Sequence, residues 1–177
     1  MRPNMKIRLN NIVCLLAITA FGGLASTASA SGVHITKAGV TFTADHNVLT
    51  LTASGQIAGL GGGAIVTISA TANPTTTCTN QGGNAAPGQN PAPITLTGTT
   101  GVPDTGSKNG SRPFSVTTTP PTQPTDASDA GCPNDSWTAH IDDLCFTSAT
   151  LTFQQPDKNG NLVTVLTVGP IFFNPCK

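Results

Sequence analysis

Few residues of this chain could take part in catalysis. It contains three histidines, His34, His46 and His140, and eight acidic residues, all of them aspartate. Nucleophilic catalysis needs a base beside an activated Ser or Cys, and no histidine lies near a Gly-x-Ser-x-Gly turn. Glycosidases use two carboxylates, whereas most of these aspartates lie in segments typical of turns. The sequence therefore contains no recognisable catalytic motif.

One His and Asp pair has a spacing suited to an interaction. His140 and Asp142 alternate on one face of a predicted strand, opposite to Trp137 and Ile141. This alternation is typical of a half-buried strand, so it favours two polar residues on the solvent side over a catalytic pair. Trp137 is then expected in the core. A hydrolase that uses His140, Asp142 and Asp143 is the alternative.

Metal binding has little support from residue spacing. Residues 157–161 resemble the first half of a calcium-binding loop, but Leu162 and Val168 stand where the loop needs a glycine and an acid. A hairpin turn explains the segment better. Three aspartates near Cys132 could form an irregular oxygen site: Asp126, Asp129 and Asp135. No spacing rule supports that site, so we predict neither a metal nor a cofactor.

The first 30 residues have the three-part pattern of a secretory signal peptide. Basic residues precede the apolar run 12–24, and Ala28-Ser29-Ala30 supplies the small residues that a signal peptidase reads. The run is shorter than the ~20 residues that a membrane-spanning helix needs. Cleavage after Ala30 predicts a secreted, extracellular chain of residues 31–177 without a membrane span. In a Gram-negative bacterium that location would be the periplasm.

Composition excludes several classes of protein. Only 9% of the residues are charged, and 8 Lys and Arg balance 8 Asp. A nucleic-acid partner is excluded because the chain has no cationic footprint to neutralise phosphates. Helix formers are scarce beside 19 Gly, 14 Pro and many Thr, which excludes helical bundles and coiled coils.

Short runs of Val, Ile, Leu, Phe and Thr alternate with a period of two between clusters of Gly, Pro, Asn and Asp. This pattern predicts about eight strands and no helix. The strands are expected at 40–44, 48–54, 64–72, 94–98, 114–118, 137–143, 149–155 and 162–168, with 171–173 as a tail. The alternation slips phase twice within 142–148, where a bulge could replace the expected turn. We predict one all-β domain, an immunoglobulin-like antiparallel β-sandwich.

Two long segments, 73–93 and 119–136, are expected to be irregular because their prolines disfavour ladder pairing. Loops of this length often carry function. The first therefore holds the candidate binding residues Gln81, Asn84, Gln89 and Asn90. The glycine-rich segment 57–63 leads into a strand pattern, which favours a strand connection over a phosphate loop.

Removal of the signal leaves four cysteines: Cys78, Cys132, Cys145 and Cys176. An even number in an exported chain predicts two disulfides, and the absence of a Cys-x-x-Cys pair disfavours zinc. Two strand passes separate Cys78 from Cys132, which places both at the same end of a sandwich.

The second disulfide follows from a hairpin register. A turn at Asn159-Gly160 sets Leu151 opposite Val168 and Phe153 opposite Leu166, so that apolar residues meet on one face. Extended, this register brings Cys145 close to Cys176. We therefore predict the pairs Cys78–Cys132 and Cys145–Cys176.

These observations favour a non-catalytic protein with a structural, adhesive or binding role outside the cytoplasm. The two cysteine-linked loops are expected to carry that role. The expected partner is a cell-surface or extracellular protein or a glycan. Besides the hydrolase, an inhibitor or effector that docks one long loop into its partner is an alternative.

Overall fold

The computed structural model describes residues 32–106 and 110–173. The predicted signal peptide, residues 1–30, and Cys176 lie outside these ranges. The eight strands are β1 (His34–Asp45), β2 (Thr50–Ala58), β3 (Ala64–Thr79), β4 (Ala85–Pro87), β5 (Ile94–Val102), β6 (Arg112–Thr117), β7 (Thr138–Pro156) and β8 (Leu162–Phe172). The described residues form no helix, and accordingly none that could cross a membrane.

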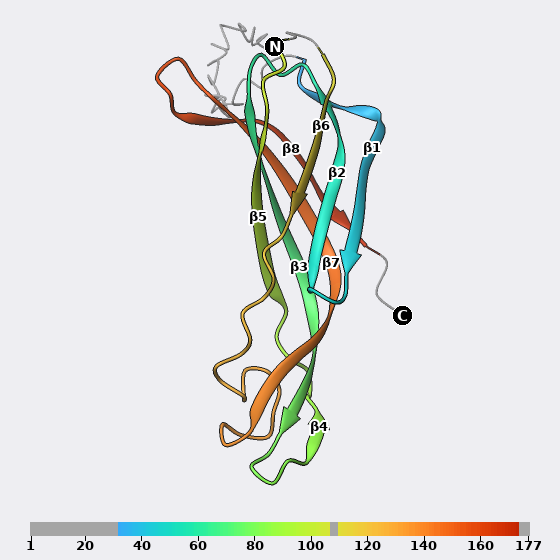
Figure 1. The fold of residues 1–177 in the computed structure, drawn as a ribbon, viewed down its shortest axis with the longest axis vertical. Helices are drawn as coiled ribbons and strands as arrows, with labels where there is room; N and C mark the ends of the chain where they lie inside the picture. The colour runs from blue at the N-terminus through green and yellow to red at the C-terminus, as the bar shows by residue number, and fades with distance from the viewer. Residues whose placement is uncertain (1–31, 107–109, 174–177) are drawn as a thin grey trace, which may run out of the picture.

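The strands form two antiparallel sheets (Figure 1). One contains β1, β2 and β6 in that order, and the other contains β4, β3, β7 and β8, with β5 also paired to β3. β5 and β4 pair with successive parts of β3, at 64–72 and 77–79 respectively. The prediction of an all-β chain with antiparallel pairing is confirmed; the immunoglobulin-like arrangement is not.

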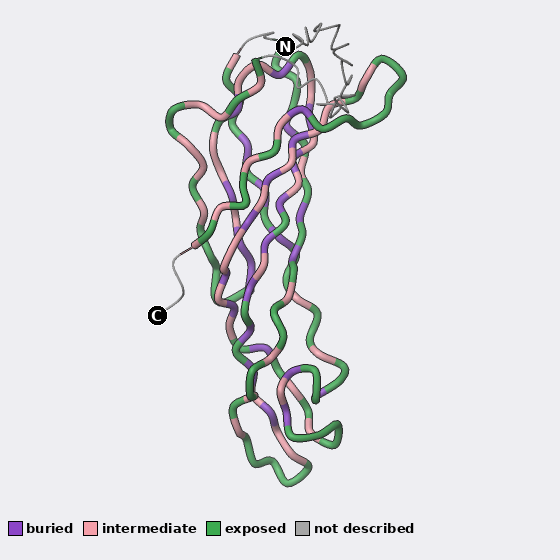
Figure 2. Tube along the Cα trace, turned by 180° about the vertical axis from the view of Figure 1, so that it is seen from behind, coloured by how far each residue is buried: buried purple, intermediate pink, exposed green. Residues whose placement is uncertain are grey.

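The facing sides of the two sheets form the main core. Every second residue of β3 is buried, which is the period that places alternate side chains on opposite faces. Phe114 of β6 and Phe153 of β7 meet edge to face across the sheets, with ring centroids 5.1 Å apart. Figure 2 shows the buried residues running along the body of the molecule.

β3 and β7 form one long ladder, from the pair Ile65 and Gln154 to the pair Thr79 and Thr138. The prediction of two strands at 137–143 and 149–155 is therefore wrong. Two register shifts leave Thr147 and Asp142 of β7 without a partner in β3. These bulges explain the two phase slips of the sequence, because each extra residue reverses the face of those that follow.

The segment 73–93 is also more regular than predicted. β3 continues through Pro74 to Thr79, and β4 follows, so only 80–84 and 88–93 are irregular. Pro74 is tolerated because β3 has a strand neighbour only on the β7 side between residues 73 and 76. The segment 119–136 contains no strand, as predicted.

The β7–β8 hairpin has the predicted register at its centre. Leu151 pairs with Val168, Thr152 with Thr167 and Phe153 with Leu166. Register shifts flank these pairs, and the connection spans 157–161. Asp157 holds this turn by accepting hydrogen bonds from the backbone N–H groups of Asn159 and Asn161.

The predicted disulfide Cys78–Cys132 is present, with Cα atoms 5.6 Å apart. It joins the end of β3 to the segment 119–136 and forms a second small core with Ala127 and Ala130. Trp137 packs on this small core, half-buried, and not in the main core as predicted. Cys145 is also disulfide-bonded. Its expected partner, Cys176, lies outside the described residues, so that pairing stays a prediction.

Arg112 closes the opposite end of the main core. Its side chain is only 1% exposed, and it donates hydrogen bonds to the backbone oxygens of Gly62 and Leu60 and to Asp104. Gln155 Nε2 donates to the Gly62 oxygen as well. The glycine-rich segment is thus a strand connection, as predicted, and its carbonyl groups satisfy a buried cation.

We expect Arg112→Met to lower the free energy of unfolding by about 1–3 kcal/mol, because the buried Leu60 carbonyl loses the hydrogen bond that Arg112 donates. Asp104 is 56% exposed, so Asp104→Asn should cost less than about 1 kcal/mol. Urea denaturation of both variants measures the difference. Equal losses for the two would contradict this account of Arg112.

Candidate functional site

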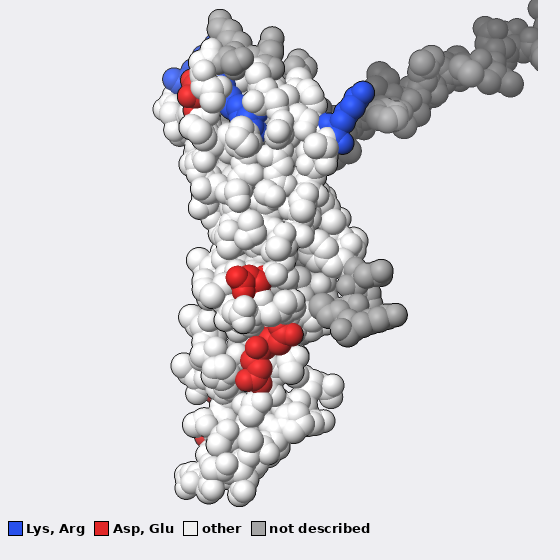
Figure 3. All heavy atoms as spheres, turned by 45° about the vertical axis from the view of Figure 1, so that its right-hand side comes forward, with Lys and Arg blue, Asp and Glu red and all other residues white. Residues whose placement is uncertain are grey.

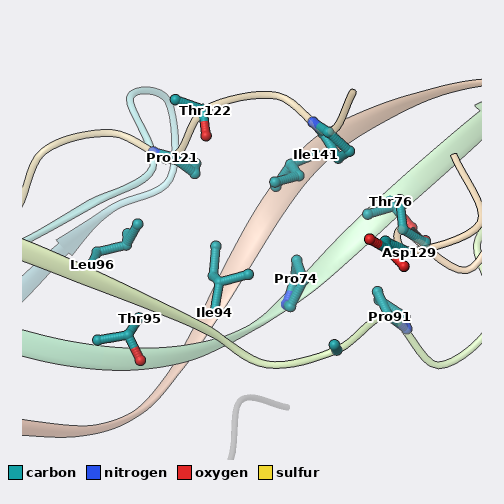
Figure 4. Close-up of a pocket in the computed structure, with 13 residues that line it drawn as sticks. Pro74, Thr76, Pro91, Ile94, Thr95, Leu96, Pro121, Thr122, Asp129 and Ile141 are labelled. Atoms are coloured by element: carbon teal, nitrogen blue, oxygen red, sulfur yellow. Dashed lines mark hydrogen bonds between the residues drawn. The ribbon is translucent and has the colours of Figure 1, made fainter. Parts of the chain in front are cut away.

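A cleft lies at the end of the two-sheet body, where β3 and β7 continue toward β4 (Figure 4). Its volume is about 490 Å³. One wall is the start of β5 with Pro91, Ile94 and Leu96, and the other is the 119–136 segment with Pro121 and Pro124. Side chains of the long ladder line the cleft between these walls: Pro74, Thr76 and Ile141. The cleft is therefore mostly apolar.

Local sequence explains why a cleft forms here. β5 leaves β3 after the pair of Ile94 and Ala72, and β4 joins β3 only at the pair of Pro87 and Thr77. Between them, at 73–76, no strand pairs with this edge of β3, and only the Thr76 backbone oxygen accepts a hydrogen bond there, from the Gly88 N–H. The prolines in both walls cannot donate to a ladder, so neither wall extends the sheet into this gap.

The 119–136 segment is fixed to the ladder at several points. Besides the Cys78–Cys132 disulfide, Thr76 Oγ1 donates to the Ala130 oxygen at 2.8 Å. The Ile141 N–H donates to Gln123 Oε1 at 2.7 Å. These contacts come from both ends of the segment, so the wall of the cleft is held in place before any ligand binds.

The connection between β4 and β5 packs closely against the same segment. The Gln89 N–H donates to the Gly131 oxygen at 2.8 Å. Gly131 has a φ of +79°, and a Cβ there would collide with the backbone of Gln89. A Cβ on Gly88 would collide with the Thr76 side chain. Glycine is therefore required at both positions for the two walls to approach.

Asp129 is the one charged residue among those that line the cleft. Its carboxylate makes no hydrogen bond or ion pair within the described part of the chain, and Figure 4 shows it beside Thr76. Further acidic residues lie at this end of the molecule: Asp126, Asp135 and Asp142. The described cations, Lys37, Arg112 and Lys158, lie toward the other end, and Figure 3 shows this separation on one face.

None of the four predicted binding residues lines the cleft. Gln81 and Asn84 are exposed in the β3–β4 turn, where Asn80 Oδ1 accepts hydrogen bonds from the turn backbone. Gln89 and Asn90 are exposed and directly precede Pro91. Sequence reasoning selected the polar residues of this loop. Prolines and isoleucines in and beside this loop line the cleft instead. Their position in or next to a predicted long loop was the only sequence signal for a role in binding.

His140 and Asp142 interact on an exposed face, as their alternation predicted. His140 Nδ1 lies 3.0 Å from Asp142 Oδ1, and Thr77 Oγ1 donates to Asp142 Oδ2 at 2.6 Å. In a catalytic triad the imidazole stands between the nucleophile and the carboxylate. Here the carboxylate stands between the hydroxyl and the imidazole, so His140 is not placed to take a proton from Thr77. Neither His140 nor Asp142 lines the cleft.

Asp143 pairs with His46 instead. His46 Nδ1 lies 2.6 Å from Asp143 Oδ1, and both side chains are at least half exposed. The hydrogen bond and the charge of Asp143 raise the pKa of His46 above 6.5, with a smaller contribution from Asp45. His46 also borders an apolar pocket of about 190 Å³ between β1 and β7, beside Phe42 and Phe146.

Two of the three aspartates proposed as an oxygen site come together. Asp126 and Asp135 both accept a hydrogen bond from the Ser128 N–H. The pKa of Asp126 is lowered, first by its hydrogen bond with Asp135 and then by Ser128. Asp129 faces the cleft instead. Among the residues that the structure describes, no three His, Cys, Asp or Glu side chains could together hold a metal ion.

Comparisons with protein-family models, with curated proteins and with solved structures found no match to this chain.

We expect the imidazole of His46 to titrate above pH 6.5, because Asp143 stabilises its protonated form. The pair then contributes stability that is complete below pH 6.5 and is lost as the pH rises through the pKa of the folded state. NMR titration of the ring protons measures this pKa.

Asp143→Asn should return the His46 pKa toward 6.5, whereas Asp142→Asn should leave it unchanged. A wild-type midpoint at or below 6.5, or one that Asp143→Asn does not move, would show that the pair does not form.

Proposed function

We propose that this protein is an exported, non-catalytic binding protein that holds its ligand in the cleft between β3, the start of β5 and the 119–136 segment. The observation that carries the proposal is an apolar cleft of about 490 Å³ whose wall is fixed by a disulfide and by hydrogen bonds. Ligand sites in proteins have volumes of roughly 300–1,000 Å³ and are mostly apolar, with a few polar groups. A preformed wall also reduces the entropy lost on binding.

An immunoglobulin-like connectivity is part of the proposal. β1, β2 and β6 are joined as strands A, B and E of that fold, and β3, β7 and β8 as strands C, F and G. β5 lies beside β3, where variable-type domains carry an additional strand. The likeness concerns connectivity alone, since the chain has no Tyr for a tyrosine corner and Cys78–Cys132 does not join the two sheets.

Export is supported by the pattern of residues 1–30. The Cys78–Cys132 disulfide is compatible with an extracellular location, because disulfides persist in oxidising compartments. The hydrolase alternative is less well supported, because His140 pairs with Asp142, and Asp143 with His46, in two exposed pairs outside the cleft. An effector that docks a loop would need a protruding segment, whereas 119–136 is tied to the ladder.

The proposal is tested by NMR screening of a small-molecule fragment library against the mature chain, residues 31–177. Binding should perturb the amide resonances of Ile94, Leu96 and Ile141. Ala92 is exposed and lines the cleft, so Ala92→Trp should fill it and weaken binding by about ten-fold, or 1.4 kcal/mol.

Ala85→Trp is the matched control, because Ala85 is exposed in β4 and does not line the cleft. It should bind fragments as the wild type does. Fragments that perturb only other regions, or that bind Ala92→Trp as tightly as the control, would overturn the proposal.

A further inference from the structure

We propose that the ligand of the cleft is a small primary alkylammonium ion, that is, an aliphatic chain that ends in an ammonium group. This inference rests on the proposed binding function of the cleft and specifies the chemical class of its ligand. Three features of the lining carry it: its apolar walls, its acceptor groups and the sign of its charge.

The walls suit an aliphatic chain. Ile94, Leu96 and Ile141 contribute branched side chains to the lining, and Pro121 and Pro124 belong to the wall formed by the 119–136 segment. Within the described ranges, none of the residues that line the cleft is aromatic. Quaternary ammonium ions are commonly recognised by the faces of aromatic rings. The lining therefore favours a primary ammonium, which binds through hydrogen bonds.

The polar groups of the lining are hydrogen-bond acceptors or hydroxyls. Asp129 contributes a carboxylate, whose oxygens accept hydrogen bonds, and Thr76 and Thr122 contribute hydroxyl oxygens. The Thr76 hydroxyl already donates to Ala130, so its oxygen remains as an acceptor. An ammonium group has three donors and no acceptor, which matches this set.

The charge around the cleft has the same sign. Asp129 lines it, and Asp126, Asp135 and Asp142 lie at the same end of the molecule, with no Lys or Arg among the described residues there. A carboxylate ligand would be repelled, whereas a cation would be attracted by Asp129 and by the surrounding field.

A peptide strand is a less suitable occupant. The gap in the edge of β3 at 73–76 could in principle accept an added strand. On that edge, the backbone oxygen of Thr76 accepts a hydrogen bond from the Gly88 N–H. Every second residue of a strand points its backbone N–H and C=O groups to the same side. Pro74 therefore faces the gap, and it has no N–H to offer a peptide.

The test is an NMR titration of the mature chain at pH 7 with hexylammonium, 1-hexanol and hexanoate. All three ligands carry the same aliphatic chain. Hexylammonium should bind about two- to five-fold more tightly than hexanol, the range expected for one exposed charge pair. Hexanoate should bind more weakly than hexanol, and hexyltrimethylammonium more weakly than hexylammonium.

Asp129→Asn should abolish the preference for hexylammonium and leave the affinity for hexanol unchanged. Asp104→Asn is the control of equal net charge, because Asp104 lies beside Arg112 at the other end of the molecule, and it should retain the preference.

If hexanol binds in the cleft and hexylammonium binds no more tightly, the inference is overturned and the proposed function stands. If none of the three ligands perturbs Ile94, Leu96 or Ile141, both are overturned. The tripeptide acetyl-Leu-Lys-Leu-amide represents a segment of a partner protein. If it binds and hexylammonium does not, the inference is overturned in favour of a partner protein.

Discussion

The disulfide between Cys78 and Cys132 is the constraint on which the end of the molecule that contains the cleft depends. β3 and β7 extend past the two-sheet body, and the sheet of β1, β2 and β6 does not follow them (Figure 1). A ladder without a second layer has little apolar area to bury. Here the 119–136 segment supplies the missing cover, and the disulfide, with Ala127, Ala130 and Trp137 around it, replaces the absent sheet by a small core.

The same arrangement leaves space as well as providing stability. Irregular chain cannot cover a ladder as closely as a second sheet, and proline-containing segments cannot pair with its free edge. The cover is therefore fixed where the disulfide and the hydrogen bonds of Thr76 and Gln123 hold it, and it stands away from the ladder between these points. The main core is closed at its far end by Arg112. The closed main core and the cleft in the extension of the ladder thus have separate causes.

Much of the fold could be predicted from the sequence because period-two alternation reports directly which residues face a core. The central register of β7 and β8 and the Cys78–Cys132 pair followed from that period and from strand counting. The phase slips at Asp142 and Thr147 were visible too, but alternation alone does not distinguish a bulge from a turn.

The site could be predicted only in part. Gln81, Asn84, Gln89 and Asn90 were selected because polar loop residues often bind ligands, yet the cleft is formed by Pro74, Ile94, Ile141 and prolines of both loops. The cleft exists because no strand pairs with one edge of β3 at 73–76. Which strands pair with that edge depends on the tertiary fold and not on the local sequence of β3. The pairing of His46 with Asp143 depends on the approach of two sheets in the same way.

Hydrogen exchange of the Cys78→Ala, Cys132→Ala double variant tests most directly whether this disulfide holds the cover on the ladder. The amides of Ile141 and Gln89 donate across that junction. We predict that both exchange at least about ten-fold faster without the disulfide, as expected for local opening, while the amides of Ile68 and Leu151 in the main core keep their protection. Unchanged protection of Ile141 and Gln89 would contradict the account.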